Sequence, residues 1–165
     1  MSENLPDEQV RPGESSAQRY DRNWEEILQE LRVTQTGTQI LTGFLLALAF
    51  QQRFREVDRY ELVVYLVLVG LACVATALAL APVSLHRWLF QRKAKRQVVL
   101  IGNRILRANL IAVALLVVGV VLFVFDFVVG FWAGFVAGVV AALVVAALWV
   151  LLPFDVRRHG PAEVD

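Results

Sequence analysis

The sequence predicts an all-α integral membrane protein, a four-helix transmembrane bundle of two antiparallel hairpins whose first helix extends into the cytoplasm. Two observations predict this fold class. Hydrophobic residues make up 58% of the 165 residues, a fraction typical of membrane proteins rather than of soluble domains. They are gathered in four long apolar segments, and roughly 20 apolar residues are enough for a helix to cross a hydrocarbon core of about 30 Å.

The predicted membrane domain covers residues 21–158. Its four predicted spans are residues 33–50, 62–83, 105–125 and 131–152. We expect a disordered tail at residues 1–20, which are polar and acidic, and a short C-terminal tail at residues 159–165. The four segments lack the alternating pattern of membrane β-strands, and a helix satisfies its own backbone hydrogen bonds in lipid, so helices are expected throughout.

Positive charge predicts the orientation. Of the 16 lysine and arginine residues, three lie between the first two spans, namely Arg53, Arg55 and Arg59. The remaining 13 of the 16 lie before the first span, in the segment from the end of the second span through Arg107, and after the fourth span. Because basic segments stay on the cytoplasmic side, we expect a multi-pass protein of the cytoplasmic membrane with both termini inside.

The first span is the most polar of the four, and its helix starts near Asp21. On a helical wheel of 100° per residue, the apolar residues before the membrane and the polar residues within it lie on one side of the helix. All of them lie within about 60° of one direction. These residues are Trp24, Leu28, Leu31, Gln35, Thr38, Gln39 and Thr42. A straight helix with this side facing the other helices gives packing partners both to the apolar residues before the membrane and to the polar residues within it. The alternative is that residues 21–31 lie flat on the membrane surface.

The polar part of that side is a candidate functional face, formed by Gln35, Thr38, Gln39 and Thr42. The favoured interpretation is hydrogen bonding between helices inside the protein. A second hypothesis is a polar pathway or a small polar site, and a third is a contact between copies of the chain.

The fourth span has a small residue at every fourth position, a candidate helix-packing ribbon. Its members are Gly130, Gly134, Gly138, Ala142 and Ala146. Small side chains let another helix backbone approach closely. The favoured interpretation is packing within one chain, and a homodimer contact is the alternative.

Asp126 is the one acidic residue that we expect could lie within the membrane. A carboxylate inside the membrane is an ion-coupling candidate. Its position at the outer end of the third span, beside a tight turn, favours a role in the turn or in capping the helix.

The basic run between the second and third spans predicts contact with the membrane surface. Arg92, Lys93, Lys95 and Arg96 can attract anionic lipid headgroups, at about 1 kcal/mol per charge. The simpler interpretation, which we favour, is that these charges set the topology.

Sequence motifs of soluble enzymes are missing. The chain has no phosphate-binding loop, HExxH, GxSxG or CxxC motif, and its single cysteine, Cys73, lies in an apolar run. The sequence therefore predicts no enzyme activity, no cofactor, no metal site and no nucleic-acid partner.

Several runs resemble a family of small, four-span membrane proteins from high-GC actinobacteria, a domain of unknown function. The similar runs are Glu30–Leu46, Gln52-Arg53-Phe54, Ala81-Pro82-Val83, His86-Arg87 and Asn103-Arg104. The resemblance covers about residues 20–158 and implies a four-span fold and a membrane location, without catalytic residues. Some members are automatically labelled as sodium:proton antiporters.

One position departs from that family. Its members often have proline before the phenylalanine of a Phe-x-x-Arg-Phe run, whereas this chain has Ala49 before Phe50.

The sequence leaves two functions open. We expect a non-enzymatic accessory or structural membrane component that acts through helix contacts with the bilayer, with a further copy or with another membrane protein. The alternative is a small oligomeric transporter or channel for protons or monovalent cations. It ranks second because an antiporter normally needs carboxylates within the membrane, and Asp126 lies at an edge.

Overall fold

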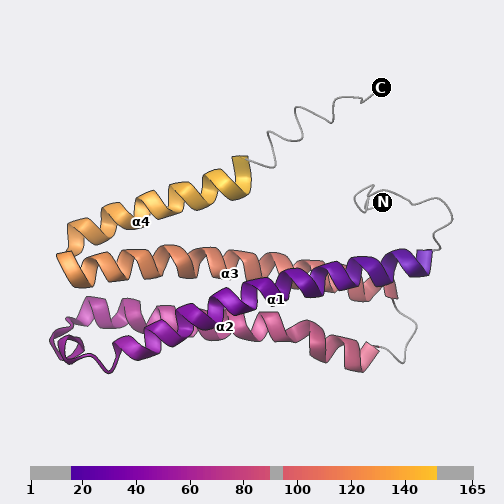
Figure 1. The fold of residues 1–165 in the computed structure, drawn as a ribbon, viewed down its shortest axis with the longest axis horizontal. Helices are drawn as coiled ribbons and strands as arrows, with labels where there is room; N and C mark the ends of the chain where they lie inside the picture. The colour runs from indigo at the N-terminus through magenta and orange to yellow at the C-terminus, as the bar shows by residue number, and fades with distance from the viewer. Residues whose placement is uncertain (1–15, 90–94, 152–165) are drawn as a thin grey trace.

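The computed structural model describes residues 16–89 and 95–151 (Figure 1). Four long helices form this part of the chain, which confirms the all-α prediction. They are α1 (Ser16–Leu48), α2 (Arg59–Leu89), α3 (Lys95–Val129) and α4 (Phe131–Ala146). A 3-10 turn, η1 (Gln52–Glu56), lies between α1 and α2, and a short π-helical segment, η3 (Ala147–Leu151), continues α4.

Three of the described helices are long and apolar enough to cross a membrane, which indicates a membrane location. The spans are Arg59–Pro82 in α2, Val99–Val129 in α3 and Phe131–Trp149 in α4 with η3. α1 does not meet this composition, because its second half has polar side chains at Thr34, Gln35, Thr36, Thr38, Gln39 and Thr42.

α1 is one unbroken helix, so residues 21–31 continue it rather than forming a separate surface helix. It begins at Ser16, five residues before the start expected at Asp21. The extra residues include Ala17, Gln18 and Arg19, which are good helix formers, and this explains the longer helix. Residues 1–15 and 152–165, which contain most of the predicted tails, lie outside the described residues.

α1 and α3 run in the same direction, and α2 and α4 run opposite to them (Figure 1). α3 packs against each of the other three helices, and α1 also packs against α2. α4 lies on the other side of α3 from α1, and the C-terminal end of α4 diverges from α3 (Figure 1). The arrangement is therefore a three-helix core with a fourth helix attached to one side, rather than a closed bundle.

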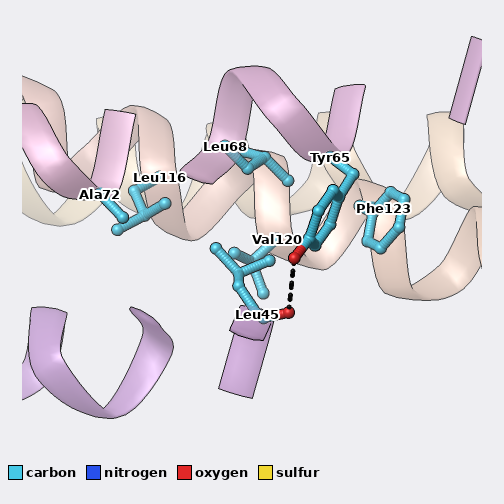
Figure 2. Close-up of a cluster of buried hydrophobic side chains, with 7 residues drawn as sticks. All are labelled: Leu45, Tyr65, Leu68, Ala72, Leu116, Val120 and Phe123. Atoms are coloured by element: carbon cyan, nitrogen blue, oxygen red, sulfur yellow. Dashed lines mark hydrogen bonds between the residues drawn. The ribbon is translucent and has the colours of Figure 1, made fainter. Parts of the chain in front are cut away.

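The larger apolar cluster lies where α1 ends and α2 begins. Figure 2 shows its seven buried side chains, Leu45, Tyr65, Leu68, Ala72, Leu116, Val120 and Phe123. The Tyr65 hydroxyl donates a hydrogen bond of 3.2 Å to the carbonyl oxygen of Leu45. That carbonyl is in the last turn of α1, so the tyrosine joins the end of α1 to α2.

A second cluster joins the first half of α1 to the beginning of α3. It consists of Ile27, Leu31, Val99 and Leu106. Beside it Trp24 is buried against Gly102, where an added Cβ atom would lie only 2.8 Å from the indole ring. The glycine therefore makes room for the tryptophan.

A single residue, Gly130, connects α3 to α4, where the sequence suggested a loop of about five residues. Its φ angle is +122°, a conformation that residues with a side chain rarely adopt. The α3 helix extends further than predicted, through Val129, so Asp126 belongs to its last turn rather than to a loop.

Candidate functional site

The inward polar groups of α1 are threonine hydroxyls that bond to their own helix. Thr34 Oγ1 donates to the Leu31 carbonyl at 2.9 Å, and Thr38 Oγ1 donates to the Thr34 carbonyl at 2.9 Å. Thr42 Oγ1 donates in the same way to the Thr38 carbonyl at 2.7 Å. These hydroxyl hydrogens are satisfied inside one helix, which lets the threonines lie in an apolar interface.

A hydrogen bond between side chains joins α1 to α3. Asn109 Nδ2 donates to Thr34 Oγ1 at 3.0 Å, and Asn109 is only 1% exposed. Sequence analysis did not select Asn109. The available signal was a lone amide in the third predicted span, where a polar side chain requires a partner.

The predicted polar face is divided by the structure. Thr38 is buried and Thr42 half-buried, whereas Gln35 is half-buried at the edge and Gln39 is exposed. The buried side of α1 is instead formed by Trp24, Ile27, Leu31, Thr38 and Leu45. This side is turned by about 40° from the predicted one on a helical wheel. The prediction was centred on the two glutamines, but the apolar residues and threonines provide the contact surface.

Two glycines of the predicted ribbon lie on the α4 surface that contacts α3. Gly134 and Gly138 are buried, and an added Cβ on Gly134 would lie 2.8 Å from the backbone nitrogen of Asp126. On Gly138 an added Cβ would lie 3.0 Å from Leu122 Cβ. The two helix backbones are therefore in close contact within one chain.

The second half of the ribbon does not follow this surface. Ala142 and Ala146 are exposed, while Ala141 and Val145 are half-buried. A helix has 3.6 residues per turn, so a spacing of four drifts by about 40° at each step, and residues 141 and 145 take over the inward positions.

Asp126 is 7% exposed and lies against α4, at the place where α4 begins. The Cβ atom of Asp126 would be 2.6 Å from a Cβ atom added to Gly134. The carboxylate therefore lies in the α3–α4 interface at the tight turn.

The remaining predictions concern anionic lipid and metals. Arg92 and Lys93 lie outside the described residues, and Lys95 and Arg96 form the first turn of α3. Within residues 16–89 and 95–151, no cluster of three or more His, Cys, Asp or Glu side chains is placed to hold a metal ion.

Comparisons with known proteins identify a family. The model of a family described as "Family of unknown function (DUF6328)" matches residues 13–153. No curated protein and no solved structure is significantly similar to the chain.

The close contact of α4 with α3 predicts that Gly134→Ala destabilises the protein by about 1–3 kcal/mol, because the added methyl group meets backbone atoms that cannot turn aside. Thermal unfolding of the purified protein in detergent measures this loss. Gly37→Ala is the matched control, because no atom lies within 4 Å of an added Cβ there. Equal melting temperatures for the two variants would contradict the contact.

Proposed function

The chain belongs to the DUF6328 family, whose function is unknown, and we propose that it is a non-enzymatic component of the cytoplasmic membrane. In this proposal it crosses the membrane four times, with both termini in the cytoplasm. It acts by binding a helix of a partner chain, either another membrane protein or a second copy, through the outward side of α1.

The position of α1 beside α3 supports the fourth span. Thr34 bonds to Asn109, and Leu45 packs with Leu116 and Val120, so the parallel helices stay in contact along the α3 span. Both helices rise 1.5 Å per residue. A helix that is parallel to a span and in contact with it along its length occupies the same depth, so α1 crosses the membrane if α3 does.

The same alignment places Gln39 near the middle of the membrane. Gln39 is five residues after Thr34, at the depth of Ala114, which is the central residue of the span Val99–Val129. Its side chain is exposed, and no hydrogen bond of its amide is found in the described part of the chain. Leaving such a group in hydrocarbon costs several kcal/mol. This observation carries the proposal, because a partner helix can provide the missing hydrogen bonds.

Small residues beside Gln39 provide space for that partner. Thr36, Gly43 and Ala47 are exposed on the same side of α1, and no atom lies within 4 Å of a Cβ added to Gly43. Helices pack closely in membranes where small residues replace large ones, and amide side chains bond across the contact. This surface, Thr36, Gln39, Gly43 and Ala47, is the outward polar stripe.

Charge supports the proposed orientation. The three arginines assigned to the outer side, Arg53, Arg55 and Arg59, lie together in η1 and at the first residue of α2. The other lysines and arginines of the described residues lie in the first half of α1 up to its centre, near the end of α2 and in the first half of α3, and the positive-inside rule assigns that side to the cytoplasm. Lys95 and Arg96, at the first residues of α3, then lie on the cytoplasmic side, where we propose that they attract anionic lipid.

A second candidate function is the transport of protons or monovalent cations by an oligomer. The observation that favours it is Asp126, a carboxylate with little exposure within the α3 span. It ranks second because the threonine hydroxyls on the inward side of α1 are bonded to their own helix.

The four-span topology predicts that the two ends of α1 lie on opposite sides of the membrane. In a Cys73→Ser background, Gln52→Cys is expected to react with an impermeant maleimide in intact cells. Glu25→Cys is expected to react only after the membrane is opened. Both side chains are exposed in the structure. Labelling of both in intact cells, or of neither, would exclude the fourth span.

The outward polar stripe predicts that Gly43→Leu lowers recovery of the partner chain roughly tenfold in affinity purification from mild detergent, because the larger side chain separates the helices. Gly70→Leu is the matched control, because Gly70 is an exposed glycine of α2 with equally open surroundings. Mass spectrometry then distinguishes a different partner from a second copy. Recovery of the monomer alone from the unmodified protein would refute the proposal.

The transport alternative predicts cation-dependent proton flux in liposomes that contain the purified protein and a pH-sensitive dye. Asp126→Asn is expected to abolish this flux, since an amide does not bind and release a proton near neutral pH as a carboxylate can. No flux with Na⁺ or K⁺ from the unmodified protein would remove this alternative.

A further inference from the structure

We propose that an anionic phospholipid binds between α3 and the diverging end of α4. Its phosphate group lies on Arg104 and Arg107, and one acyl chain lies along the neighbouring apolar side chains of α3. The site is on the other side of α3 from α1, so it is separate from the outward polar stripe. It requires only that α3 and α4 cross the membrane, as their candidate spans indicate.

The divergence of α4 leaves room beside α3. Gly138 lies against Leu122, but beyond this contact α4 diverges, and η3 is not in extensive contact with α3 (Figure 1). Because the helices are antiparallel, Trp149 and Ile111 lie at about the same level, each about three turns beyond that contact. Both belong to the facing sides of the two helices, yet Trp149 is 45% exposed and Ile111 is 62% exposed. The two helices therefore do not cover each other there.

Four exposed residues form one strip along this uncovered part of α3. They continue the side of α3 that holds α4, because on a helical wheel each lies within about 60° of the direction of Leu122. α1 and α2 pack on other sides of α3 and leave the strip open. The members of this α3 strip are Arg104, Arg107, Ile111 and Leu115.

The length and depth of the α3 strip match one leaflet of a bilayer. Arg104 lies ten residues before Ala114, the central residue of the α3 span, and therefore about 15 Å from the middle of the membrane. This is the edge of a hydrocarbon core of about 30 Å. From Arg104 the strip runs about 17 Å inward to Leu115. Its occupant is therefore charged at one end and apolar over the length of one leaflet, as a lipid is.

The two arginines identify the headgroup. Arg104 and Arg107 are one turn apart on the same side of α3, where their Cβ atoms are about 5–6 Å apart, so both can reach one phosphate. No ion pair or ring contact of either is found in the described part of the chain. Arg107 starts within the hydrocarbon, and its long side chain can extend to the level of Arg104.

The chemistry of guanidinium favours a phospholipid with a net negative charge. A guanidinium group presents paired N–H donors that match phosphate oxygens. Basic sites between membrane helices bind anionic lipid headgroups in the same way. In a zwitterionic lipid the ammonium group would repel the two arginines, so phosphatidylglycerol is expected to bind more tightly than phosphatidylcholine.

Native mass spectrometry tests the site with the full-length protein, released from nanodiscs that contain equal amounts of phosphatidylglycerol and phosphatidylcholine. The unmodified protein is expected to retain phosphatidylglycerol in preference. Arg104→Gln and Arg107→Gln are each expected to lower this retention about fivefold, and the double variant about thirtyfold, because each arginine attracts the phosphate.

Arg32→Gln is the matched control and is expected to leave retention unchanged. Arg32 is exposed at about the depth of Arg107 but belongs to α1, as the bond between Thr34 and Asn109 two residues further on shows. Equal retention of the two lipids, or an equal loss in Arg32→Gln and Arg104→Gln, would overturn the proposal. Release of the lipid by inorganic phosphate, or a lower melting temperature of the double variant in phosphatidylcholine alone, would overturn it as well.

Discussion

A polar side chain between packed apolar helices needs a hydrogen-bond partner, and this constraint determines how α1 can lie against the other helices. Its hydroxyl groups donate to carbonyls of the same helix, and Thr34 also accepts a bond from Asn109. The threonines can therefore face inward beside leucines. Gln39 lies on the outer side of α1 together with Thr36, whereas Thr34 and Thr38 lie on the inner side.

α3 meets its three neighbours with three kinds of surface. α1 is joined to it by a polar pair between two apolar clusters, and α2 packs on it through a row of alanines. α4 makes its closest contacts with α3 through two glycines near its start. Of the three candidate membrane spans, the one in α4 is the least buried, and its second half has large exposed side chains.

The helical fold and the membrane location follow from the length and apolar character of the segments, and the sequence predicted both. Which side of each helix faces its neighbours was harder to predict. The glutamines shifted the predicted inward side of α1, since polarity alone does not distinguish a side chain that faces a protein from one that faces lipid. Of the predicted ribbon, Gly134 and Gly138 lie in the close contact with α3, and Ala142 and Ala146 are exposed. The roles of Gly102 and Asn109 depend on contacts between residues 75 to 78 positions apart, which no local pattern reveals.

The one-residue turn at Gly130 has a consequence for how the protein is made. A link of one residue contains no polar loop that could remain in water on one side of the bilayer between the insertion of α3 and that of α4. We therefore expect α3 and α4 to enter the lipid together, as one hairpin.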